Sequence, residues 1–130
     1  MNALITPDEV PRWIPGRLTL DSTPLGWEET VLKGYRYDSL DVEIPTMRDF
    51  MIVVYRSGVA EMSRRSGGPW QSARVEPGVV SILTRAEQSR WRWDKAIEVS
   101  LLYLSQSAVA RVAGEVFDKD IRDVEMRDMI

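Results

Sequence analysis

The stretch Glu76–Trp93 reads EPGVVSILTRAEQSRWRW, and the interpretation of the whole chain starts from it. A Pro-Gly turn precedes the apolar run Val79–Leu83, which has the length of a strand. After a polar loop, the RWRW motif places Trp91 and Trp93 on one face of a second strand and Arg90 and Arg92 on the other, because strand side chains alternate. The stretch therefore predicts two strands joined by a polar loop, the second with an aromatic face.

Strand-like segments also flank this stretch on both sides. Phe50–Arg56 is continuously apolar, which is typical of a strand buried on both faces. The turn Ser66-Gly67-Gly68-Pro69 predicts a tight hairpin, because glycine supplies the positive φ that such turns need. Short turns between strands favour an antiparallel sandwich or barrel over βαβ units. The remaining predicted strands are Glu29–Tyr37, Asp41–Ile44, Val59–Arg65, Trp70–Val75 and Ile97–Leu104.

The two ends of the chain differ from this β-rich middle. Residues 1–16 carry Pro7, Pro11 and Pro15 and predict an extended N-terminal arm, because proline removes a backbone donor. Ser105–Phe117 has helical spacing of apolar residues, and Ser105 is a suitable N-cap. We therefore expect an arm over residues 1–16 and one domain over residues 17–130.

The composition excludes several classes of function. The chain contains no His and no Cys, so an imidazole or thiolate metal site and a His-based catalytic triad are impossible. A net charge of −3 gives no overall basic character for binding DNA. No run of about 18 apolar residues predicts a membrane span, and no signal-peptide pattern opens the chain, so we expect a cytoplasmic location.

Carboxylates are the remaining candidates for metal binding or acid–base chemistry. We interpret them as solvated turn and cap residues, since charged side chains are seldom buried. We therefore expect no catalytic residue, no metal and no other cofactor. The two clusters are Asp38, Asp41 and Glu43, and Asp118, Asp120 and Asp123.

Several motifs, in this order and spacing, resemble the N-terminal cupin-like domain of AraC-family transcriptional regulators. The resemblance covers about residues 25–130. It implies a cupin-like, jelly-roll type β-barrel with an N-terminal arm and a C-terminal helix. It also implies that DNA is bound only by a separate C-terminal domain, which this chain does not contain. The motifs are VVYRSG (Val53–Gly58), the EPG turn leading into SILTR, RWRW, SLLYLS (Ser100–Ser105) and DVEMRD (Asp123–Asp128).

The second motif of metal-binding cupins is altered in this chain. That motif runs Gly, five residues, Pro, any residue, Gly, two residues, His. Starting from Gly78, Thr84 stands in the Pro place, Ala86 in the second Gly place and Ser89 in the His place. These groups bind divalent metals poorly, so a metal-dependent cupin enzyme is disfavoured.

The resemblance implies a regulatory sensor that binds a small-molecule effector inside the barrel, forms a homodimer, or does both. It places Trp91 where a ring would stack on the effector. Two alternatives remain: a structural dimerisation module without a ligand, which would expose the apolar helix or a strand edge, and a metal-free cupin enzyme. The further candidates for the ligand site are Trp93, Tyr35, Tyr55, Arg90 and Trp13.

Overall fold

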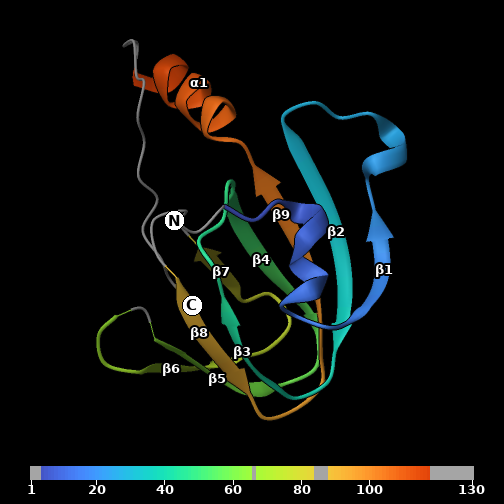
Figure 1. Ribbon diagram of the computed structural model, residues 1–130, viewed down its shortest axis with the longest axis vertical. Coiled ribbons are helices and arrows are strands. Elements are labelled where there is room, and N and C mark those ends of the chain that lie inside the picture. The colour runs from blue at the N-terminus through green and yellow to red at the C-terminus, as the bar shows by residue number, and fades with distance from the viewer. Residues whose placement is uncertain (1–3, 66, 84–87, 118–130) are drawn as a thin grey trace.

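The computed structural model describes residues 4–65, 67–83 and 88–117, and its strands form two antiparallel sheets (Figure 1). The five-stranded sheet has the order β1-β2-β9-β4-β7 and the four-stranded sheet the order β3-β8-β5-β6. The first contains Arg17–Asp21 (β1), Thr30–Tyr37 (β2), Ile97–Leu104 (β9), Phe50–Ser57 (β4) and Val80–Leu83 (β7). The second contains Leu40–Ile44 (β3), Ser89–Trp93 (β8), Ala60–Arg65 (β5) and Gln71–Val75 (β6).

The predicted fold class is confirmed: the chain is mainly β, with a cupin-like pair of antiparallel sheets and a C-terminal helix. Every predicted strand is present, with ends that differ by at most one residue. Among the described residues no backbone pairing joins the two sheets, so the architecture is an open sandwich rather than a closed barrel. The strand β1, which the sequence reasoning did not place, adds to the edge of the larger sheet beside β2.

One hydrophobic core fills the space between the sheets. Along β9, Ile97, Val99, Leu101 and Tyr103 are buried and point inward, as the two-residue period of a strand requires. The facing strand β8 contributes Trp91 and Trp93.

The prediction that Phe50–Arg56 is buried on both faces is only half correct. On β4, Met51, Val53 and Tyr55 point inward and are buried, whereas Ile52 and Val54 point outward and are only partly buried. A continuous apolar run does not reveal by itself how much of its second face other elements cover.

The arm departs from the predicted extended conformation over Pro7–Arg12, which forms a short 3-10 helix, η1. Pro7 occupies its first position, where the missing N–H costs nothing. The Glu9 carboxylate accepts hydrogen bonds from the Thr6 backbone N–H, at 3.1 Å, and from the Thr6 hydroxyl, at 3.0 Å. This local pairing closes a turn that the proline content alone did not predict. A second 3-10 turn, η2 (Thr23–Leu25), follows β1.

The C-terminal helix α1 covers Gln106–Phe117 and stands beyond the end of β9 (Figure 1). The Ser105 hydroxyl accepts a hydrogen bond from the Ala108 N–H at 3.1 Å, which confirms Ser105 as the N-cap. Within the described part of the chain, helices are too short and too polar to cross a bilayer.

Candidate functional site

The space between the two sheets contains a small cavity with a volume of about 40 Å³. Met62, Trp91 and Trp93 line it from the four-stranded sheet, and Tyr55 and Leu101 line it from the five-stranded sheet. This volume has room for roughly one to three water molecules, whereas pockets for drug-sized ligands measure about 300–1,000 Å³. The interior is therefore almost filled by the protein's own side chains.

Both tryptophan N–H groups in this interior are already satisfied by the protein. The Trp91 indole N–H donates to the Ser89 hydroxyl at 3.0 Å, and the Trp93 indole N–H donates to the Asp38 carbonyl at 2.7 Å. The Trp93 ring also packs against Tyr37, with ring centroids 5.7 Å apart. Both rings thus present an apolar surface to the cavity, while their N–H groups are hydrogen-bonded within the protein.

The tyrosines provide the polar groups that remain inside. The hydroxyl of Tyr55 hydrogen-bonds the Ser81 hydroxyl at 2.9 Å, whereas those of Tyr37 and Tyr103 have no hydrogen-bond partner among the described residues. Burial raises the pKa of both Tyr37 and Tyr103 far above the usual value of a phenol. Each therefore stays protonated, and Tyr37, which lines the cavity, carries a neutral buried hydroxyl.

The N-terminal arm closes one side of the interior. Its side chains Ile5, Val10 and Ile14 are buried in the same core cluster as the tryptophans, and Ile14 lines the cavity. Ile5 is held by backbone hydrogen bonds on either side of Met47: its N–H donates to the carbonyl of residue 46 and its carbonyl accepts from the N–H of residue 48. The arm is thus part of the wall around the cavity.

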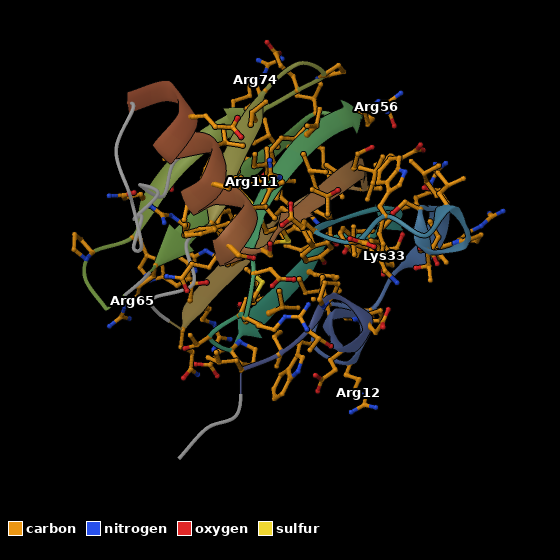
Figure 2. All side chains as sticks on the ribbon, turned by 90° about the horizontal axis from the view of Figure 1, so that it is seen from above. Arg12, Lys33, Arg56, Arg65, Arg74 and Arg111 are labelled. Carbon is orange, nitrogen blue, oxygen red and sulfur yellow. The ribbon has the colours of Figure 1, made fainter. Side chains whose placement is uncertain are left out.

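An ion pair fastens the arm to the larger sheet. Lys33 is on β2 (labelled in Figure 2). Its ammonium group donates to an Asp8 carboxylate oxygen at 2.9 Å and lies 3.9 Å from an Asp21 carboxylate oxygen. Desolvation lowers the pKa of Lys33, but the hydrogen bond and the attraction from Asp8 more than offset it, so its pKa is raised. Lys33 is buried although it is charged, and it therefore depends on these carboxylates.

The residues predicted for the ligand site divide into two groups. Trp91, Trp93 and Tyr55 line the cavity together, and Tyr35 is buried on the same inner face and stacks on Tyr37 at 5.6 Å. The other two predicted residues, Arg90 and Trp13, do not join them.

The structure places Arg90 and Trp13 away from the cavity. Arg90 lies on the outer face of β8 and pairs with Asp41 at 2.9 Å, because the alternation that turns Trp91 inward turns Arg90 outward. Trp13 is 45% exposed at the end of η1, and the next residue, Ile14, takes the interior position instead.

Sequence reasoning missed several residues of the interior. Tyr37 has the same strand parity as Tyr35, a signal that would have found it. Arg64 on β5 also points inward: it is buried, its guanidinium lies 5.7 Å from the centre of the Trp91 ring, and it donates to Gln71 at 2.9 Å. Arg64 shares its strand parity with Ala60 and Met62, and this alternation distinguishes it from its exposed neighbour Arg65.

Of the three positions at which the metal motif is altered, Ser89 is among the described residues, and it has a structural role. Ser89, in the place of the motif histidine, is buried and accepts the Trp91 hydrogen bond. Thr84, Ala86 and the cluster Asp118, Asp120 and Asp123 lie outside the described residues. Within the described part of the chain, no three carboxylates converge on a possible metal position, so Asp38, Asp41 and Glu43 do not form one.

Neither a protein-family model nor a curated protein matches this chain. Solved structures do match its fold. The AraC-like transcriptional activator CuxR aligns with a TM-score of 0.52 and 14% identity, over 70% of this chain and 35% of that one. A protein assigned as ethanolamine utilization protein Q from Salmonella typhimurium aligns with a TM-score of 0.51 and 9% identity, over 67% of this chain and 65% of that one.

An enzyme shares the same fold. The DMSP lyase DddQ from Ruegeria pomeroyi aligns with a TM-score of 0.50 and 16% identity, over 61% of this chain and 40% of that one. Identities this low show a common fold and nothing more specific. This chain spans about a third of the length of CuxR and less than two thirds of the other two. This fold thus occurs both in an activator and in a lyase, so the fold alone does not define a function.

Proposed function

We propose that this chain is the regulatory sensor domain of an AraC-type transcription factor, which binds a small effector between its sheets and does not itself bind DNA. One observation carries the proposal: Ile14 of the arm forms part of the cavity wall, so the arm and the interior are one structural unit. A ligand that enters the interior must therefore change how the arm packs.

The chemistry of the interior narrows the class of effector. The walls are aromatic and aliphatic, with the Tyr37 hydroxyl as an unpartnered polar group among the described residues. We propose a small, mainly apolar molecule with one hydrogen-bonding group. Because the cavity measures about 40 Å³, binding requires Ile14 or a neighbour to move aside. The arm then has two conformations, one with Ile14 in the cavity wall and one with it moved aside. The effector shifts the equilibrium between them by the difference between its affinities for the two.

The nearly filled interior also supports a second candidate, a ligand-free dimerisation module. A core without a preformed pocket is what such a module needs, and α1 leaves Val112 50% exposed. A metal-free cupin enzyme has less support, because it would need an open pocket in which an acid or base meets the substrate. We therefore propose that the domain is not an enzyme.

The sensor proposal is tested by adding the small probes benzene and p-cresol to the wild-type chain and to Ile14→Ala. This substitution enlarges the cavity from the arm side. We expect p-cresol to raise the melting temperature of Ile14→Ala more than benzene does, because it reaches the Tyr37 hydroxyl. Trp91→Phe should reduce the accompanying change in tryptophan fluorescence, with Trp93 still reporting on the cavity, and Trp70→Phe, outside the cavity, should keep it in full. If neither probe stabilises either protein, the interior is not a ligand site and the dimerisation module becomes the better proposal.

A further inference from the structure

The outward face of the five-stranded sheet carries a row of large apolar side chains. Ile82 on β7 lies opposite Ile52 on β4, Ile52 lies opposite Leu102 on β9, and Leu102 lies opposite Leu32 on β2. Side chains directly opposite each other on one face of a sheet are in contact range. These four residues therefore form one continuous ridge across four strands, which we call the outer row.

The outer row is not part of the protein's own core. Each of its four residues is only partly buried, and none belongs to the core cluster between the sheets. Beside it, Val54 and Val80 form a second apolar pair, and Leu20 on the edge strand is 45% exposed. An antiparallel sheet with one face in water normally carries polar residues there. This face instead carries large apolar residues, which indicates that another surface packs on it.

The outward face of the other sheet shows the contrast. Asp41, Arg90 and Arg92 project from it, Arg90 pairs with Asp41, and Arg92 stacks on Trp70 with 4.1 Å between the guanidinium and the ring centre. This face follows the polar pattern expected of a solvated sheet. The apolar outer row is thus specific to the five-stranded sheet.

Charges at the two ends of this face are of opposite sign. At the end where β4 and β2 finish lie Arg17, Arg36 and Arg56, with Glu98 as the acidic residue among them. At the opposite end, Arg111 on α1 pairs with Glu29 and Glu115. The acidic residues of this end are Glu28, Glu29, Asp49 and Glu115, and the basic residues are Arg48 and Arg111. Figure 2 shows Arg56 at the tip of β4 and Arg111 on α1. The face therefore has a basic end, an apolar centre and an acidic end.

An apolar groove with a volume of about 740 Å³ extends the apolar centre toward α1. Thr30 and Leu104, which are paired on the same sheet, form one side of it, and Val109, Val112 and Trp27 are among its other lining residues. Strands are about 4.8 Å apart and alternate outward residues about 7 Å apart, so the two apolar rows cover roughly 250 Å². A typical interface buries about 800 Å² on each partner, with an apolar core and a polar rim. A stable pairing over the apolar rows would therefore also have to include the groove and the charged ends.

We propose that this face pairs two copies of the chain. If a two-fold axis lies in the interface and perpendicular to the strands, the outer rows pack on each other. The basic end of each copy then lies against the acidic end of the other, twice in one dimer. Such self-complementarity is what a two-fold interface requires, and a partner of uniform charge would fit only one end. This proposal is independent of whether an effector binds between the sheets.

The absence of cysteine from the chain permits a direct test, the reaction of Leu32→Cys with a maleimide at low- and high-micromolar protein. We expect labelling to slow by about tenfold or more at the high concentration, because pairing buries the outer row. Ile82→Cys, at the other end of the row, is a second variant with the same expectation. Ser72→Cys, on the outward face of the four-stranded sheet, is the control and should react equally at both concentrations.

Protection at both concentrations with a dimer in sedimentation also supports the proposal, as the result of tight pairing. Two outcomes overturn it. If Leu32→Cys and Ile82→Cys react rapidly at both concentrations, nothing covers the row. If both are protected at both concentrations while sedimentation shows a monomer, another segment of the same chain covers the row.

A charge exchange tests the geometry of pairing. The double variant Arg17→Glu/Arg36→Glu has two acidic ends, and Glu28→Arg/Glu115→Arg has two basic ends. We expect each alone to pair at least about tenfold more weakly than wild type in analytical ultracentrifugation, and an equimolar mixture to recover the dimer, since every contact is again between opposite charges. If the mixture dimerises no more strongly than either variant alone, the two-fold arrangement is refuted. Neither result depends on the probe-binding experiment, so the two proposals can fail separately.

Discussion

The closed interior makes a specific prediction about alkaline pH. The chain has four tyrosines, Tyr35, Tyr37, Tyr55 and Tyr103, and all are buried. Burial raises the pKa of each above the usual value near 10. Above that pH the unfolded chain releases phenolic protons that the folded chain retains, so the unfolded state gains stability. The free energy of unfolding is therefore unaffected by these groups below pH 10 and falls as the pH rises beyond it.

The magnitude follows from proton linkage. Each retained proton costs between 1 and 2 kcal/mol per pH unit above the unfolded pKa. If only Tyr37 and Tyr103, whose pKa values rise furthest, are counted, the loss at pH 11 is about 3 kcal/mol. Domains are typically stable by about 5–15 kcal/mol, so we expect cooperative unfolding at about pH 11 to 12. Lys33 acts in the same direction, because its pKa is also raised.

The assay is urea unfolding followed by tryptophan fluorescence from about pH 8 to about pH 12, with tyrosinate absorbance recorded in parallel. Tyrosinate should appear together with unfolding and not before it. Tyr103→Phe is the matched variant, and its stability at neutral pH should be preserved. Above pH 10, its free energy of unfolding should fall less steeply with pH than that of the wild type, by the contribution of one tyrosine. If tyrosinate forms near pH 10 while the fluorescence of the folded chain persists, water reaches the interior and the description of a closed core is wrong.

Three further predictions concern stability at neutral pH, each measured by chemical or thermal unfolding. Ser81→Ala should cost about 1–3 kcal/mol, because it leaves the Tyr55 hydroxyl buried without its partner; an unchanged stability would show that the hydroxyl finds another one. Gly58→Ala should cost more than about 1 kcal/mol, since Gly58 has a φ of +89° and an added Cβ would lie 2.5 Å from the Ala96 carbonyl oxygen; a neutral result would contradict this backbone geometry. Ser105→Ala should cost about 1 kcal/mol through the lost N-cap, whereas Ser105→Asp should retain stability.

Local patterns predicted most of the fold. Strand lengths and turn residues located eight strands, and the two-residue period of RWRW correctly placed Trp91 and Trp93 on one face. β1 was not predicted, because its five residues owe their strand conformation to pairing with β2. The 3-10 helix of the arm was missed for a related reason: the bonds between Thr6 and Glu9 overcome the extended tendency of a proline-rich segment.

The candidate site was predicted only in part. Alternation identifies which residues share a face, and it grouped Trp91 with Trp93 correctly. It also separated Arg90 from them, yet Arg90 was retained as a candidate because nothing local shows which face is inward. In the arm, the choice between Trp13 and Ile14 depends on the angle at which η1 meets the sheets, and that angle is set by Ile5, Val10 and the Asp8–Lys33 pair.

The sequence by itself determined eight of the described strands, the turns between them, the C-terminal helix with its Ser105 cap, and the impossibility of an imidazole or thiolate metal centre. These depend on the period of apolar residues and on which residue types are present. Only the tertiary structure decided that the interior is almost filled, that Ile14 completes its wall, and that Ile52 and Leu102 face outward in an apolar row. Those properties depend on how segments far apart in the chain meet, which no local pattern records.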